Sequence, residues 1–178
     1  MMPVLVCLTG LPGVGKSTIA KRVAQKTGAL WLWLDEIETA MRASHMQTDD
    51  LADGGYAAAQ AVATGALRQG YDVIADCVNP IDLTRAAWRR ASEAAGAQHL
   101  DVELTCADLV KHRHRVETRN VELPGWKVPD WASVEARGFV PLTGPGLRID
   151  TGQTEVCDAV SRVVAALWDA KNKEGTHG

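Results

Sequence analysis

Residues 4–18 read VLVCLTGLPGVGKST, and this stretch decides the fold of the 178-residue chain. The apolar start predicts a buried strand, and the residues after it match the pattern G-x-x-x-x-G-K-[ST] through Gly10, Gly15, Lys16 and Ser17. Composition alone would produce such a match roughly 0.005 times in a chain of this kind. A strand, a glycine loop and a helix in this order predict a phosphate-binding loop, or P-loop.

The residue types of this loop suit a nucleotide. Glycine permits backbone angles that aim successive N–H groups at phosphate oxygens, and the following helix points its positive dipole end at the anion. Lys16 can reach the β- and γ-phosphates, and Ser17 can offer a hydroxyl to magnesium. We therefore expect ATP and Mg²⁺ as cofactors, with a nucleotide-binding set that includes Gly10, Leu11, Pro12, Gly13, Val14, Gly15, Lys16, Ser17 and Thr18.

A dinucleotide-binding loop is the competing interpretation. Gly13 and Gly15 begin a G-x-G pattern, and Asp35 follows about 20 residues later at the end of an apolar run. However, Thr18 stands where the third glycine belongs, and the Lys-Ser pair would have no role. The P-loop is the better prediction.

Apolar runs and helically spaced stretches alternate along the chain. The predicted strands are Val4–Leu8, Leu30–Leu34, Asp72–Ala75, Leu100–Leu104 and Leu147–Ile149. The predicted helices are Lys16–Lys26, Glu36–Ala43, Leu51–Arg68, Leu83–Ala95, Ala107–Arg119 and Thr154–Lys171. This alternation predicts a single α/β domain over residues 1–178, with three layers and a mostly parallel sheet covered on both faces.

Residues 120–146 break the alternation. They hold four of the seven prolines and show no sustained periodicity. Because long irregular loops in compact domains are commonly functional, we expect a lid and substrate-covering segment at about residues 112–146. We expect the tail, residues 171–178, to be disordered.

Composition narrows the classes of function. The net charge of −3 gives no general attraction to nucleic acid, so we do not expect a nucleic acid partner. No apolar run approaches the roughly 20 residues that span a bilayer, and the N-terminus lacks a basic leader, so we expect a cytoplasmic protein without membrane contact. The four cysteines lie far apart without a C-x-x-C pair, so neither zinc nor a disulfide is expected. The oligomeric state is left open.

Polar residues follow two predicted strands at the sheet edge where ligands bind in parallel α/β proteins. Asp35 could act as the general base that takes a proton from an attacking hydroxyl, or it could cap the next helix. Asp76 ends the third apolar run and, with Ser17, predicts a magnesium site. Asn79 could contact the substrate or cap the helix that follows it.

Basic residues precede and enter the predicted lid. Arg115 and Arg119 share one helix face, where they could clamp the transferring phosphoryl group or form a solvated surface. Arg137 is a third candidate. His112 and His114 lie two residues apart and so point to different sides of a helix, which argues against a metal pair.

Tryptophans form a further group of candidates. Trp126 and Trp131 lie in the lid segment and could stack on a base or anchor the lid to the core. The others are predicted to be packing residues: Trp31, Trp33, Trp88 and Trp168.

The sequence resembles the small-molecule kinases of the P-loop superfamily. These include gluconate kinase, chloramphenicol phosphotransferase, adenylylsulfate kinase, the zeta toxins and the 5′-kinase domain of polynucleotide kinases. GLPGVGKS is similar to their phosphate loop, Asp35 to the position of their general base, IADCVN to their third-strand motif and HRVETR to their arginine-bearing lid helix. The nearest resemblance is to bacterial kinases described as AAA-family ATPases.

This resemblance implies a nucleoside-kinase-like P-loop NTPase with a five-stranded parallel sheet in the order 2-3-1-4-5. It places the loop after the fifth strand, with Gly152, near adenine, and Arg115 beside the nucleotide. Together with the residues above, it predicts transfer of the ATP γ-phosphoryl group to a hydroxyl of a small molecule. The catalytic residues would be Lys16, Asp35, Arg115 and Arg119.

Two other functions stay open at this point. A polynucleotide 5′-hydroxyl kinase would need a basic groove, whereas residues 85–137 hold nine Lys or Arg against eight Asp or Glu. A non-enzymatic, nucleotide-dependent switch would bind a protein partner through the lid. The segment around Trp126 and Trp131 fits none of the named kinases, so the identity of the phosphoryl acceptor is not predicted.

Overall fold

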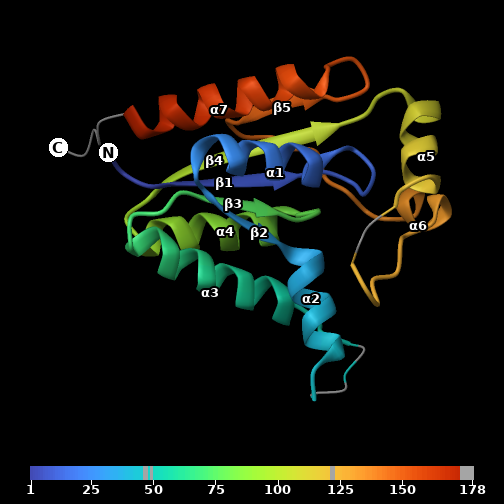
Figure 1. Ribbon diagram of the computed structural model, residues 1–178, viewed down its shortest axis with the longest axis horizontal. Helices are drawn as coiled ribbons and strands as arrows, with labels where there is room; N and C mark the ends of the chain where they lie inside the picture. Colours follow the sequence, from blue (N-terminus) through green and yellow to red (C-terminus); the bar gives the residue numbers. More distant parts are fainter. Residues whose placement is uncertain (46–47, 49, 121–122, 173–178) are drawn as a thin grey trace.

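A five-stranded parallel sheet with helices on both faces forms the domain (Figure 1). The computed structural model describes residues 1–45, 48, 50–120 and 123–172. The strand order is β2-β3-β1-β4-β5, and every neighbouring pair runs parallel. The predicted fold class and strand order are confirmed.

The observed elements follow the predicted ones closely. The strands are β1 Val4–Thr9, β2 Leu30–Trp33, β3 Val73–Asp76, β4 Gln98–Thr105 and β5 Leu147–Asp150. The helices are α1 Lys16–Thr27, α2 Leu34–Ala43, α3 Gly54–Arg68, α4 Asp82–Ala94, α5 Leu109–Glu117, α6 Trp131–Glu135 and α7 Val156–Asn172. None of the helices that the structure describes is long and apolar enough to cross a bilayer.

Strand β1 is the centre of the core, and all six of its residues are buried. Since side chains alternate along a strand, Val4, Val6 and Leu8 join the cluster under α1 and α7. Leu5 and Cys7 point to the other face and join the cluster under α3 and α4. The continuous apolar run in the sequence reflects a strand that is buried on both faces.

The lid segment contains a short helix that the sequence did not indicate. Helix α6 has only five residues, too few for a periodic pattern to be recognised. Its N-cap is Asp130, whose carboxylate accepts a hydrogen bond from the Ser133 amide at 2.8 Å. In Figure 1, α5 and α6 lie together beyond the carboxyl ends of the central strands.

The chain end differs slightly from expectation. Helix α7 continues through Asn172, and the Lys171 ammonium lies 2.6 Å from the buried Asp72 carboxylate. Lys171 and Asn172 therefore belong to the helix rather than to the predicted tail. The rest of that tail, residues 173–178, and lid residues 121–122 lie outside the described residues.

Asn79 has neither of the roles considered from the sequence. Helix α4 is N-capped by Ile81, and the Asn79 side chain is fully buried. Its backbone takes a left-handed conformation with φ of 49°, its amide N–H donates to Tyr56 Oη at 3.1 Å, and its Nδ2 lies 3.2 Å from Cys7 Sγ. Asn79 shapes the turn after β3 instead of capping a helix or lining a cavity.

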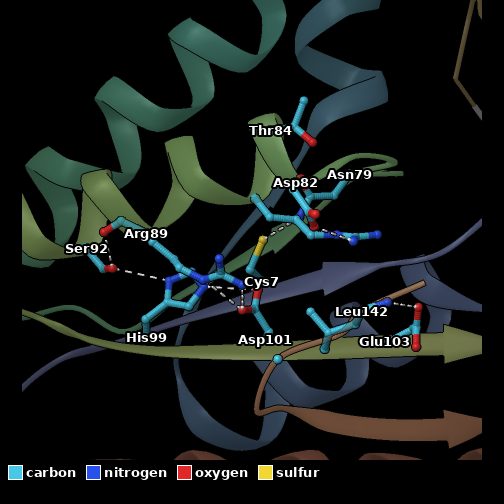
Figure 2. A network of polar contacts seen from close by, with 12 residues as sticks. Cys7, Asn79, Asp82, Thr84, Arg89, Ser92, His99, Asp101, Glu103 and Leu142 are labelled. Atoms are coloured by element: carbon cyan, nitrogen blue, oxygen red, sulfur yellow. Dashed lines mark hydrogen bonds and ion pairs between the residues drawn. The ribbon is translucent and has the colours of Figure 1, made fainter. Parts of the chain in front are cut away.

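A buried polar network ties α4 to β4. His99 lies between Ser92 and Asp101, with ring nitrogens 3.2 Å from Ser92 Oγ and 3.1 Å from Asp101 Oδ1 (Figure 2). The Arg89 guanidinium also donates to the Asp101 carboxylate, at 2.7 and 3.2 Å. Burial raises the pKa of Asp101, but the hydrogen bonds and charges of His99 and Arg89 outweigh it and hold the pKa below its usual value.

We predict that Asp101→Asn lowers the free energy of unfolding at pH 7 by about 2 kcal/mol, because it removes the partner of Arg89 and His99. A carboxylate with a lowered pKa in the folded state stabilises the protein above its unfolded pKa, near 3.9, and this contribution is lost as the pH falls through the folded pKa. The variant should therefore lose less stability than the wild type below about pH 4. Urea denaturation at several pH values measures both effects.

Glu93→Gln is the matched control, since Glu93 is exposed on the same helix as Arg89. It should leave the unfolding free energy nearly unchanged. Equal stability of Asp101→Asn and the wild type at pH 7 would contradict the assignment.

Candidate active site

The loop between β1 and α1 is shaped by glycines at which any larger residue would be strained. Gly13 has φ of 85°, and a Cβ atom there would lie 2.5 Å from Val116 Cγ2 on α5. Gly15 has φ of 96° and forms the N-cap of α1. Helix α1 therefore starts with free N–H groups facing the loop, which is the arrangement that binds anions.

Lys16 opens α1 and is buried. Its ammonium donates to the carbonyls of Gly10 at 2.8 Å and Leu11 at 3.0 Å. Burial lowers the pKa of Lys16, the carboxylates of Asp76 and Asp35 raise it, and the net effect is a lowered value. The ammonium thus lies against the first two residues of the loop, with the carboxylates of Asp76 and Asp35 nearby.

Asp76 ends β3 beside the loop, with 2% of its surface exposed. Its carboxylate accepts hydrogen bonds from Trp31 Nε1 at 3.2 Å and from the side chain of Ser17. Burial raises the pKa of Asp76, and Lys16, Ser17 and Trp31 reduce that rise. Ser17 and Asp76 together offer oxygen donors only, which suits Mg²⁺, an ion that takes one or two protein carboxylates and draws other ligands from water and phosphates.

Asp35 lies in the first turn of α2, whose N-cap is Trp33 without a side-chain hydrogen bond. The capping role considered for Asp35 is therefore wrong. Its side chain instead faces a cavity that also reaches Lys16 and Asp76. Among the described residues, no group of three or more His, Cys, Asp or Glu side chains is placed to hold a metal ion.

Two cavities meet at the loop. The first, of about 730 Å³, runs along the loop and α1 and is called here the loop cavity; Gly13, Thr18, Arg115, Thr151 and Thr154 are among the residues that line it. The second, of about 760 Å³, lies between α2 and the lid and is called the lid cavity; Asp35, Glu38, Asp76, Trp126 and Arg137 are among the residues that line it. Lys16, Ser17 and Arg119 line both. A ligand in one cavity can therefore meet a ligand in the other at these three residues.

Arg119 is the lid arginine that reaches the junction. Its guanidinium lies over the Trp126 ring, 4.6 Å from the ring centroid. Burial lowers its pKa, and the carboxylates of Asp35 and Asp76 counter this effect. Of the two arginines predicted to clamp the transferring group, Arg119 therefore lines both cavities, whereas Arg115 lines the loop cavity alone.

Arg115 lines the loop cavity. Its two terminal nitrogens donate to Thr151 Oγ1 at 2.9 Å and to the Thr151 carbonyl at 3.0 Å, and it does not line the lid cavity. This position suits contact with a nucleotide better than a clamp on the transferring group. Gly152 follows Thr151, and its carbonyl accepts a hydrogen bond from Lys111 at 3.0 Å.

Thr151 and His112 hold the loop in place, and the sequence did not single out either role. Thr151 Oγ1 lies 2.8 Å from the carbonyl of Val14 and 3.0 Å from that of Thr105, besides accepting from Arg115. His112 is buried, and its Nε2 lies 2.8 Å from the carbonyl of Pro12. Since a carbonyl only accepts, Nε2 must carry the hydrogen. No local pattern marks such residues, because their partners are distant in the sequence.

The lid tryptophans are tied to neighbouring side chains. Trp131 meets His112 edge to face, with ring centroids 5.1 Å apart, which supports the anchoring role. Trp31 and Trp33 stack at 5.6 Å and line the loop cavity, so they do more than pack. Trp88 is buried as predicted, whereas Trp168 is 41% exposed.

The family model described as AAA domain matches residues 5–128, well over half of the chain. A candidate kinase from Chloroflexus aurantiacus superposes with a TM-score of 0.74 at 21% identity, covering 95% of this chain and 98% of that one. An APS kinase from Mycobacterium tuberculosis, solved with AMPPNP and APS, superposes with a TM-score of 0.70 at 21% identity, covering 94% of this chain and 98% of that one. A gluconokinase from Sinorhizobium meliloti superposes with a TM-score of 0.66 at 19% identity, covering 96% of this chain and 95% of that one. No curated protein sequence matches significantly.

These likenesses establish the fold of P-loop kinases for this chain. The predicted resemblance to the P-loop small-molecule kinases is thereby confirmed. The roles of individual site residues stay predictions.

We predict that Thr151→Val lowers the free energy of unfolding by about 1–3 kcal/mol, because the Val14 carbonyl and the Arg115 guanidinium each lose a partner. Thr151→Ser keeps the hydroxyl and should lower the free energy of unfolding much less. Urea denaturation compares the two variants. Equal losses in both would show that the methyl group, and not the hydroxyl, matters.

Proposed function

The chain belongs to the AAA domain family whose model it matches, and on that premise we propose that it transfers the γ-phosphoryl group of ATP to a hydroxyl group of a small molecule, in the presence of Mg²⁺. One observation carries the proposal. Lys16, Asp35 and Asp76 line the same cavity, and that cavity joins the phosphate-binding loop through Lys16 and Ser17. A base, a cation and a metal-binding carboxylate are the groups that phosphoryl transfer requires.

The donor half of the reaction belongs to the loop cavity. The loop N–H groups and the Lys16 ammonium would hold the phosphate oxygens, and Arg115 and Thr154 would lie beside the rest of the nucleotide. Ser17 and Asp76 would hold Mg²⁺. The ion supplies positive charge to the phosphate oxygens when it is bound.

The acceptor half belongs to the lid cavity. Asp35 would accept the proton of the acceptor hydroxyl. At the same time the hydroxyl oxygen would form a bond to the γ-phosphorus of ATP, and the bond between that phosphorus and the ADP oxygen would break. Lys16 and Arg119 lie at the junction of the cavities, where they would stabilise the charge of the transferring group. The Arg119–Trp126 contact would help to exclude water over that point.

We predict that Asp35→Asn lowers kcat by about 10²–10⁴-fold, because the amide cannot take the proton. The dissociation constant for ATP should change by less than about threefold, since Asp35 does not line the loop cavity. Transfer of label from γ-labelled ATP to a panel of small hydroxylated compounds measures the first effect, and equilibrium binding measures the second.

Asp169→Asn, at an exposed carboxylate on α7, is the control and should behave like the wild type. Undiminished phosphorylation by Asp35→Asn would remove its role as the base. If the wild-type protein binds ATP but labels no acceptor, the nucleotide-dependent switch becomes the better explanation.

Trp31→Phe should raise the Mg²⁺ concentration that gives half-maximal activity by about tenfold, because the phenyl ring keeps an aromatic side chain beside Trp33 but cannot donate to Asp76. Because Trp31 also lines the loop cavity, nucleotide binding without metal is measured separately, and the shift in Mg²⁺ requirement should exceed any change in that binding. Titration of Mg²⁺ in activity and in equilibrium binding measures the shift. Trp168→Phe, on the outer helix α7, is the control and should leave it unchanged. An unaltered metal requirement in Trp31→Phe would show that Asp76 needs no support from Trp31.

A further inference from the structure

The lid cavity carries more positive charge than the chain as a whole. Its lining includes five cationic residues, Lys16, Arg42, Arg119, Lys127 and Arg137, against three carboxylates, Asp35, Glu38 and Asp76. The complete chain has a net charge of −3. The lining of this cavity therefore has a positive balance of charge, whereas the chain as a whole has a negative one.

Several of these groups already have a place in the proposed transfer. Lys16 and Arg119 lie at the junction with the loop cavity, Asp76 pairs with Ser17, and Asp35 faces the acceptor hydroxyl. Of the remaining charged groups, Arg42 is paired with Glu38, and the other two are the cations Lys127 and Arg137. The lining residues that have no role in the proposed phosphoryl transfer therefore carry a positive balance of charge.

Glu38 does not cancel this excess. It lies 3.4 Å from Arg42, and the charge of Arg137 also acts on it. Glu38 is thus already paired with Arg42, and Arg137 and Lys127 add two positive charges on the lid side. The three cations come from α2 and from the chain on either side of α6, so they are not one solvated face of a single helix.

From this charge distribution we propose that the phosphoryl acceptor is a small hydroxylated anion, a compound with a carboxylate, phosphate or sulfate group besides the hydroxyl that is phosphorylated. The inference rests on the kinase function proposed above. The anionic group would lie against Lys127 and Arg137, with the hydroxyl toward Asp35. Arginine and lysine bind such groups through charge-assisted hydrogen bonds.

The shape of the cavity favours a small acceptor over a nucleic acid strand. Its volume of about 760 Å³ falls within the range of about 300–1,000 Å³ that is usual for small-molecule sites. Trp126 and Pro129 give it an apolar side. A nucleic acid strand would instead need a line of cations that continues along its backbone.

The test separates acceptors by charge before their identity is known. A deproteinised metabolite extract is split by anion exchange at pH 7 into a retained and an unretained pool, and each is incubated with the full-length protein and γ-labelled ATP. A short 5′-hydroxyl oligonucleotide forms a third arm. We expect label in small molecules of the retained pool only.

Each other outcome overturns the inference. Label in the unretained pool would show a neutral or cationic acceptor while leaving the kinase function intact. Label in the oligonucleotide and not in the retained pool would favour the polynucleotide kinase. Label in no arm, with ATP bound, would remove the kinase function and the inference with it.

Charge variants then test the position of the anion. For the labelled acceptor, Lys127→Gln with Arg137→Gln should raise KM by about tenfold or more, while KM for ATP changes by less than about threefold. Lys26→Gln with Arg90→Gln removes the same charge at exposed positions on α1 and α4 and is the matched control. An equal rise in both double variants, or a rise in neither, would contradict binding of the anion at Lys127 and Arg137.

Discussion

The site depends on how the loop between β1 and α1 is held from three sides. The Gly10 amide N–H donates to the carbonyl of Val78, the His112 ring holds the carbonyl of Pro12, and Thr151 Oγ1 holds that of Val14. These contacts come from the segment after β3, from within α5 and from the residue that follows β5. Because they use backbone carbonyls and one backbone N–H, the loop shape is fixed with little dependence on its own side chains. The Val14 N–H donates to the Leu11 carbonyl at 3.5 Å, and the N–H groups at the start of α1, which have no partner within the helix, can bind an anion.

The fixed loop brings opposite charges close together in a buried place. Lys16 lies near Asp76 and Asp35, and Arg119 approaches the same carboxylates from the lid. Burial disfavours the charged forms of Lys16, Asp76 and Arg119, and neighbours of opposite charge counter that effect. Trp31 adds a neutral donor to Asp76 from the edge strand. The arrangement keeps charged groups close together where a transferring phosphoryl group needs them.

The lid is attached to the nucleotide side as well as to the acceptor side. Helix α5 carries His112, which contacts the loop and Trp131, and Arg115, which contacts Thr151. Arg119 follows that helix and lies over Trp126. Helix α5 and the residue Arg119 therefore connect the lining of the loop cavity with that of the lid cavity.

The sequence by itself determined the P-loop, the alternating α/β elements and the polar ends of β2 and β3, because these features depend on residue type and on spacings of a few positions. The resemblance to known kinases added the strand order. Tertiary structure alone decided the separate positions of Arg115 and Arg119, the core position of Asn79 and the supporting roles of Trp31, His112 and Thr151. The physical reason is sequence separation, since His112 and Pro12 are 100 positions apart in the chain, and Thr151 and Val14 are 137 positions apart. Such contacts form only when the sheet brings the strand ends together, and no local pattern records them.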